Sequence, residues 1–226
     1  MPDSSQDEMQ QARIVLQPIA PPSILGMFSF AAAAALVGAY WAGWYGSAQS
    51  YRYLFPFVGF VGGVAQFAAA LWSYHSRSGL GTVVFGVWGA FWMAHALLYL
   101  MVGIHALPDP GRASQDLGFW YVILAWIGWV TVAAAVGVSW VLAAGLGAAA
   151  LAVSLEAAAQ LGAITELEIA AGWLLVLSAL LTWYVASAVL LEATLGHAVL
   201  PLGRTGRQDE SAGLGQVAQE PGVKRQ

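Results

Sequence analysis

The chain has 226 residues, of which 59% are hydrophobic and only 9% are charged, and its mean hydropathy is +0.69. Soluble domains carry about 25% charged residues, so this composition excludes an ordinary soluble protein. The net charge is −4 and the eight Lys and Arg residues form no basic patch, so we expect no nucleic acid partner. The absence of cysteine excludes disulfides, thiolate catalysis and cysteine-ligated metals.

Six apolar runs follow one another along the chain, each about as long as a membrane-spanning helix. A helix needs about 20 apolar residues to cross a bilayer, and a backbone surrounded by lipid must be helical. The runs cover residues 24–45, 53–73, 80–104, 117–138, 141–159 and 172–192. We therefore predict an all-α integral membrane protein with a single six-helix domain over residues 21–203. Residues 1–20 form an N-terminal tail and residues 204–226 a C-terminal tail that we expect to be mobile.

Basic residues beside the spans predict the orientation of the bundle. With six spans, both tails and the second and fourth loops lie on one side of the membrane. That side holds Arg13, Arg77, Arg204 and Arg207, whereas the opposite side holds only Arg52 and Arg112. We predict a multi-pass protein of the cell membrane with both termini in the cytoplasm.

Polar groups inside the spans are few, and burying them in hydrocarbon is costly. Gln66 lies in the second span, where it is either an interhelical hydrogen-bonding residue or a pore-lining one. In the third span, a stripe at helical spacing ends at His95, which is a packing residue or a pH sensor. Glu156 lies near the end of the fifth span, and we expect it to be drawn to the headgroup region. The stripe consists of Gly81, Phe85, Trp88, Trp92 and His95.

The sequence contains no recognisable motif for catalysis or for cofactor binding. No Lys or Arg lies inside a span, which excludes a retinal Schiff base and an Arg-rich voltage sensor. No phosphate-binding loop and no catalytic triad or carboxylate pair occurs at a suitable spacing. We predict that the protein is not an enzyme, that it uses no cofactor or metal, and that it provides a path for a small solute.

Five segments resemble the motifs of one family. Residues 62–66 (GGVAQ) and 89–92 (GAFW) resemble its GGxxQ and YGxFW segments, and residues 22–30 (PSILGMFSF) resemble its NPAPLGLxGF signature. Residues 171–173 (AGW) and 196–203 (GHAVLPLG) are similar to its AGW…G-R-x-V-L-P-x-G ending. On these residues the chain resembles the acetate/succinate permease family (the GPR1/FUN34/YaaH group).

The resemblance implies a homohexamer of six-helix protomers in a lipid bilayer, with a path for a small carboxylate through each protomer. The apolar constriction of the family's path corresponds to Phe30, Trp88 and Ala149 in this sequence. The glutamine beside the path corresponds to Gln66. The same motifs supply further candidates for the path: Pro22, Ser23, Gly26, Gly62 and Gly63.

Four positions depart from the family pattern. Pro21 replaces an asparagine, Ile24 a proline, Ser73 an acidic residue, and Trp88 the tyrosine of the constriction. The change at Trp88 removes a hydroxyl group and adds bulk, so we expect a reshaped gate. Acetate, with succinate as a second candidate, remains the solute that the resemblance implies.

A carboxylate that enters an apolar constriction loses its hydration, at a large cost in free energy. It can cross as the neutral acid, or helix N-termini can stabilise the anion beside the gate. The helix start at Pro22 and Ser23 offers such N–H groups. We therefore expect a proton to accompany passage.

Two alternatives stay open at this point. The lack of cations inside the spans also suits a channel for small neutral solutes such as urea or amides. The third reading, from another class, is a redox subunit that holds haem through its histidines.

Overall fold

The computed structural model describes residues 20–47, 50–108 and 114–205, and these residues are helical with no β-strand. The first span is α1 (Pro22–Trp41). The short α2 (Ser50–Tyr53) precedes the second span, which is made of α3 (Phe55–Phe57), a π-helical segment (Val58–Ala65) and α4 (Gln66–His75). The remaining spans are α5 (Gly79–Gly103), α6 (Gln115–Val136), α7 (Trp140–Gly162) and α8 (Thr165–Leu195). Six helices are long and apolar enough to cross a membrane, which confirms the predicted fold class.

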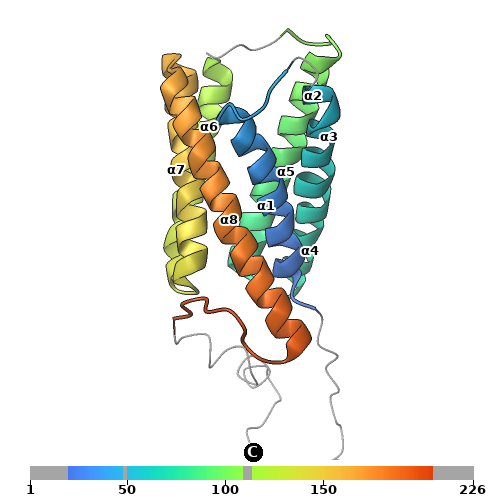
Figure 1. Ribbon diagram of the computed structural model, residues 1–226, viewed down its shortest axis with the longest axis vertical. Coiled ribbons are helices and arrows are strands. Elements are labelled where there is room, and N and C mark those ends of the chain that lie inside the picture. The colour runs from blue at the N-terminus through green and yellow to red at the C-terminus, as the bar shows by residue number, and fades with distance from the viewer. Residues whose placement is uncertain (1–19, 48–49, 109–113, 206–226) are drawn as a thin grey trace, which may run out of the picture.

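The helices form a ring around a packed interior. Following the main contacts, α6 packs against α7, α7 against α8, α8 against α1, and α1 against the π-helical segment and α4. The second span packs on α5, and a small contact between α5 and α6 closes the ring. Figure 1 shows α8 running diagonally across α1, with the start of α1 and the end of α8 at the same, lower end of the bundle. This lower end, from which both tails depart, is called the tail end below.

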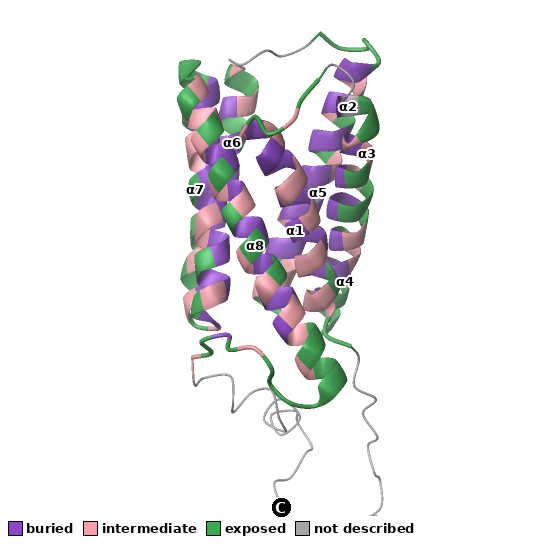
Figure 2. Cartoon of the chain, viewed as in Figure 1, coloured by how far each residue is buried: buried purple, intermediate pink, exposed green. Residues whose placement is uncertain are grey.

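The outward faces of the helices are apolar. Large hydrophobic side chains are exposed on all six spans. Figure 2 shows exposed residues, in green, along the helices that face the viewer. In water such exposure would be costly, but in a bilayer the same faces meet lipid chains. Examples with exposed fractions of 62–71% are Phe60, Trp126, Val130 and Leu180.

The first helix is shorter than predicted. We placed the first span at residues 24–45, but α1 ends at Trp41 because the chain turns through Gly43, whose φ is +74°. Beyond the turn, the Tyr45 hydroxyl donates a hydrogen bond to the Leu36 carbonyl oxygen at 2.6 Å. Burial, with a smaller contribution from Tyr40, raises the pKa of Tyr45 to about 12, so this donor stays protonated.

The last helix is longer than predicted. We placed the sixth span at residues 172–192, but α8 begins at Thr165 and has 31 residues. Glu166 and Glu168 made the preceding segment look polar, yet acidic residues stabilise the first turn of a helix. At 1.5 Å per residue, α8 is about 46 Å long, more than the ~30 Å of a bilayer core. Its diagonal course in Figure 1 accommodates part of this excess.

Glycine contacts fix two helix crossings. Gly38 on α1 and Gly172 on α8 bring their backbones together, because a Cβ atom at Gly172 would overlap the Gly38 carbonyl oxygen and the Ala42 nitrogen. In the π-helical segment, a Cβ atom at Gly62 would overlap Ala33 and press on the Trp92 ring. Small residues of this kind let membrane helices pack closely, as their abundance in the spans suggests.

The predicted tails fall largely outside the described residues. Of residues 1–20 and 204–226, the structure describes only Ala20, Arg204 and Thr205. Three of the arginines used to predict orientation, Arg13, Arg112 and Arg207, also lie outside the described residues.

Candidate functional site

A cavity of about 280 Å³ opens at the tail end of the bundle. Five helices, two connecting segments and the segment after α8 line it. The helices are α1, α4, α5, α7 and α8. The lining residues are Pro22, Ser23, Met27, Phe30, Ser73, Ser76, Ser78, Leu80, Gly81, Val84, Phe85, Val138, Ser139, Leu142, Leu146, Thr182, Val185, Val189, Leu202 and Arg204. We call this space the tail-end cavity. Its wall is mostly apolar, with hydroxyl groups and one guanidinium group near the mouth.

Three helix N-termini meet at the tail-end cavity: α1, α5 and α7 each contribute residues of their first turn to its lining. The N-cap side chains of Ser78 and Ser139 accept hydrogen bonds from the N–H groups of Gly81 and Leu142, both at 3.3 Å. Helix N-termini carry partial positive charge and free N–H groups. The arrangement therefore favours an anion at the mouth of the cavity.

Aromatic rings close the inner end of the cavity. Phe30 lines the cavity and is only 1% exposed. Its ring meets that of Trp88 edge to face, with ring centroids 5.0 Å apart, and Trp88 lies 5.5 Å from Trp92. Phe30 and Trp88, which the resemblance places at the constriction, are thus in contact where the cavity ends.

Ala149, the third predicted constriction residue, lies one helical turn beyond the cavity. The α7 residues that line the cavity are Leu142 and Leu146, and Ala149 follows Leu146 on the same face, fully buried. Leucine side chains of α7 therefore form this part of the cavity wall, and Ala149 lies outside the lining.

The predicted path residues fall into two groups. Pro22 and Ser23 line the cavity, and Gly26 contacts the Phe85 ring on its wall. Gly62, Gly63 and Gln66 lie outside the lining. Gly62 packs against Ala33 of α1 and Trp92 of α5, and Gly63 against Met93 of α5. Gln66 is fully buried, and neither its amide oxygen nor its nitrogen has a hydrogen-bond partner among the described residues.

His95 lies toward the opposite end of the bundle within an aromatic cluster. Its ring is 4.7 Å from Tyr99, 5.3 Å from Phe91 and 5.4 Å from Phe55, measured between centroids. The other three histidines are exposed, and within the described ranges no three His, Asp or Glu side chains gather as metal ligands. His95 stays a candidate for pH sensing, in surroundings that are typical of a packing residue.

Glu156 does not reach the headgroup region, contrary to our expectation. Its side chain is 1% exposed, and its carboxylate accepts a hydrogen bond from Gln160 Nε2 at 2.8 Å. Gln160 Oε1 in turn accepts from the Ser114 N–H at 3.2 Å. The glutamine supplies a partner for Oε1 of the buried carboxylate, whereas Oε2 has no hydrogen-bond partner among the described residues. Glu156 and Gln160 are four residues apart, and helical spacing places them on the same buried face of α7 as Leu146 and Val153. We missed this signal, which predicts that the two polar side chains are buried together.

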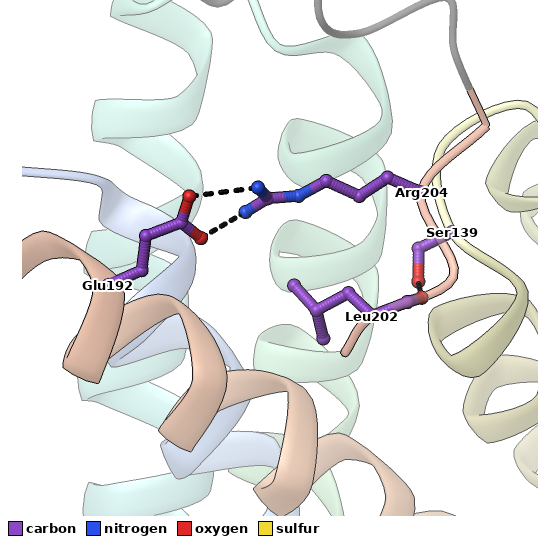
Figure 3. Close-up of polar contacts among 4 residues, drawn as sticks. All are labelled: Ser139, Glu192, Leu202 and Arg204. Carbon is purple, nitrogen blue, oxygen red and sulfur yellow. Dashed lines mark hydrogen bonds and ion pairs between the residues drawn. The ribbon is translucent and has the colours of Figure 1, made fainter. Parts of the chain in front are cut away.

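The segment after α8 is the second feature that the sequence analysis missed. It is tied to the α6–α7 turn by four hydrogen bonds. One of them, from the Ser139 hydroxyl to the Leu202 carbonyl oxygen at 2.5 Å, is drawn in Figure 3. The others join Trp140 N–H to Gly203 O, Thr205 N–H to Val138 O, and Thr205 Oγ1 to Gly137 O. We call residues 197–205 the C-terminal strap. Pro201 and Gly203, which are typical of an ordered turn, are the signal that could have revealed it.

Comparisons with known proteins agree with this architecture. The sequence model of the GPR1/FUN34/yaaH family matches residues 6–203. An uncharacterized protein of Methanothermobacter thermautotrophicus is 29% identical over 116 residues, which are 48% of this chain and 52% of that protein, so the chain spans about half the length of this curated relative. The fold is similar to that of the bacterial acetate channel SatP, with a TM-score of 0.74, 23% identity, and coverage of 82% of this chain and 100% of that one. Because the family match covers nearly the whole bundle, the chain belongs to the GPR1/FUN34/yaaH family.

Proposed function

We propose that the protein is a membrane permease or channel for small carboxylates, with acetate as the first candidate and succinate as the second. The observation that carries this proposal is the tail-end cavity, where three helix N-termini face a space that ends on Phe30 and Trp88. Family membership and the fold shared with an acetate channel support the same solute class.

The dimensions of the cavity suit a small solute. Pockets for drug-sized ligands usually measure about 300–1,000 Å³, and the tail-end cavity has about 280 Å³. Hydroxyl groups and helix N-termini near the mouth can bind a carboxylate, while the deeper wall is apolar. A short carboxylic acid matches this gradient, because its polar end can stay near the mouth while its methyl group enters the apolar part.

A proton accompanies the solute through the constriction. Phe30 and Trp88 offer no charge to replace the hydration of a carboxylate, so the anion meets a high barrier there. For an acid with a pKa of ~4.3, about one molecule in 500 is neutral at pH 7. This fraction rises about tenfold for each pH unit of acidification, so uptake increases as the external pH falls.

The path continues beyond the constriction past Gln66, whose unpartnered amide group can hydrogen-bond the solute. In this proposal the protomers form a hexamer, each with its own path. The tail end faces the cytoplasm, as the basic residues beside the spans predict.

The proposal is tested by uptake into liposomes. The purified protein is reconstituted, and uptake of labelled acetate, succinate and urea is measured with and without an inward proton gradient. We expect acetate uptake that exceeds that of protein-free liposomes and rises with the gradient. Urea uptake that is indifferent to pH, without carboxylate uptake, would replace the proposal with a neutral-solute channel. A lack of flux for all three solutes would contradict both functions.

A further inference from the structure

We propose that Arg204 binds the carboxylate at the mouth of the tail-end cavity, on the cytoplasmic side of the constriction, and that the solute replaces Glu192 as its partner. This inference rests on the proposed function, since it assigns a binding residue to the same cavity. Glu192 lies in the last turn of α8, and Figure 3 shows the guanidinium group of Arg204 facing its carboxylate.

The position of Arg204 is the first argument. Its side chain lines the tail-end cavity, and it is the charged side chain among the lining residues. It is also 37% exposed, so its guanidinium group is in contact with both bulk water and the cavity. A carboxylate that diffuses to the mouth therefore meets this cation before it meets the apolar wall.

The second argument is the way in which Arg204 is held. It belongs to the C-terminal strap, whose neighbouring residues are fixed to the α6–α7 turn by hydrogen bonds from Ser139, Trp140 and Thr205. The Tyr184 hydroxyl also donates to the Pro201 carbonyl oxygen at 2.9 Å, which ties the strap to α8. The backbone at Arg204 is thus ordered before a solute arrives, which reduces the entropy lost on binding.

The third argument is the chemistry of the pair. Two guanidinium nitrogens of Arg204, Nη1 and Nη2, bind the two carboxylate oxygens of Glu192, which is the bidentate geometry that arginine offers to any carboxylate. Glu192 is 32% exposed, and exposed ion pairs are only weakly stabilising. Glu192 therefore keeps Arg204 oriented in the empty state and can be exchanged for a solute carboxylate of the same shape.

The test is acetate transport by three variants in liposomes, with acetate supplied on the tail-end side of the membrane, compared with the unmodified protein. Arg204→Gln should raise KM for acetate about tenfold with little change in the maximal rate, since it removes charge-assisted hydrogen bonds from the entrance alone. Glu192→Gln should lower KM, because the competing internal carboxylate is gone. Arg77→Gln is the matched control, since Arg77 lies at the same end of the bundle outside the cavity lining and should keep the original KM.

Salt dependence separates a binding role from a structural one. For the unmodified protein, KM should rise with ionic strength because ions screen the attraction, and this dependence should be much weaker in Arg204→Gln. An acetate KM of Arg204→Gln equal to that of the unmodified protein would overturn the inference while leaving the proposed function intact. If Arg204→Gln does not fold, Glu192→Gln decides, and an unchanged KM there overturns the inference. Absence of acetate transport by the unmodified protein would instead remove the proposed function itself.

Discussion

In the proposed path, single side chains at the inner end of the tail-end cavity set the barrier to passage. Phe30 and Trp88 are almost fully buried and in edge-to-face contact, with no space between the rings for a solute. Their size, and not their charge, therefore limits the path. Substitutions at these positions should change flux more than stability.

Replacing Trp88 with the smaller tyrosine should raise acetate flux several-fold, because it frees volume at the constriction and adds a hydroxyl group that can hydrogen-bond the solute. Initial uptake rates in liposomes give the comparison. Trp126→Tyr is the matched control, since Trp126 is 70% exposed on the outer surface and should leave the rate unchanged. Equal rates for both variants would show that Trp88 does not limit passage.

Gln66 should affect flux and stability in opposite directions. Its amide group is buried without a partner among the described residues, and such burial costs about 1–3 kcal/mol. Gln66→Leu should therefore keep or raise the melting temperature, measured by thermal unfolding in detergent, while it slows acetate uptake. A variant that melts earlier would indicate that Gln66 is a packing residue with partners, and not a path residue.

Glu156 should matter for stability more than for the solute. Glu156→Leu leaves Gln160 Nε2 without its acceptor, so we expect a loss of about 1–3 kcal/mol in the free energy of unfolding. Glu156→Gln keeps an amide oxygen as the acceptor and should lose less. The two melting temperatures measure the difference, and a leucine variant as stable as the glutamine variant would contradict the role of the hydrogen bond.

At the level of elements, helix crossings depend on backbone contact. Gly172→Ala should separate α1 from α8, because its Cβ atom would overlap backbone atoms of Gly38 and Ala42 that cannot move aside. We expect a loss of more than about 2 kcal/mol, comparable to overpacking in a core. Gly147→Ala is the control, since its Cβ atom would meet only Val132 at 4.0 Å. Equal melting temperatures for the two variants would show that the crossing can relax.

Periodicity and hydropathy predicted all six spans, and the missed boundaries have physical causes. Hydropathy ended the sixth span early because Glu166 and Glu168 are charged, although charge of this sign favours a helix start. The π-helical segment Val58–Ala65 was not predicted, because its wider turns follow from packing against α1 and α5 and leave no local pattern. Such segments are rare and frequently occur at functional sites, and this one places Gly62 against Trp92.

The candidate site was only partly predictable, because part of it depends on contacts between residues that are far apart in the sequence. Motif resemblance pointed to Phe30 and Trp88, which the structure places in contact. It missed Arg204 and Ser139, because the strap reaches the α6–α7 turn through contacts between residues more than 60 positions apart. No local pattern in the sequence encodes such a pairing.

On the scale of the whole molecule, the ring of helices leaves apolar faces on the outside, some of which can pack against other protomers. The proposed hexamer predicts a particle of six chains in native mass spectrometry of the detergent-solubilised protein. Because each protomer contains its own tail-end cavity, dissociation into monomers should leave the affinity for acetate unchanged. A particle of one chain, or of any number other than six, in native mass spectrometry would contradict the hexamer.

The C-terminal strap also has a consequence for biosynthesis. Leu202 and Arg204, the last lining residues along the chain, leave the ribosome after all six spans. During membrane insertion, the mouth of the cavity therefore stays unfinished until the strap docks on Ser139. A ribosome that stalls after α8 would leave a bundle in the membrane without Leu202 and Arg204, so the wall of the cavity is completed only after the last span has been made.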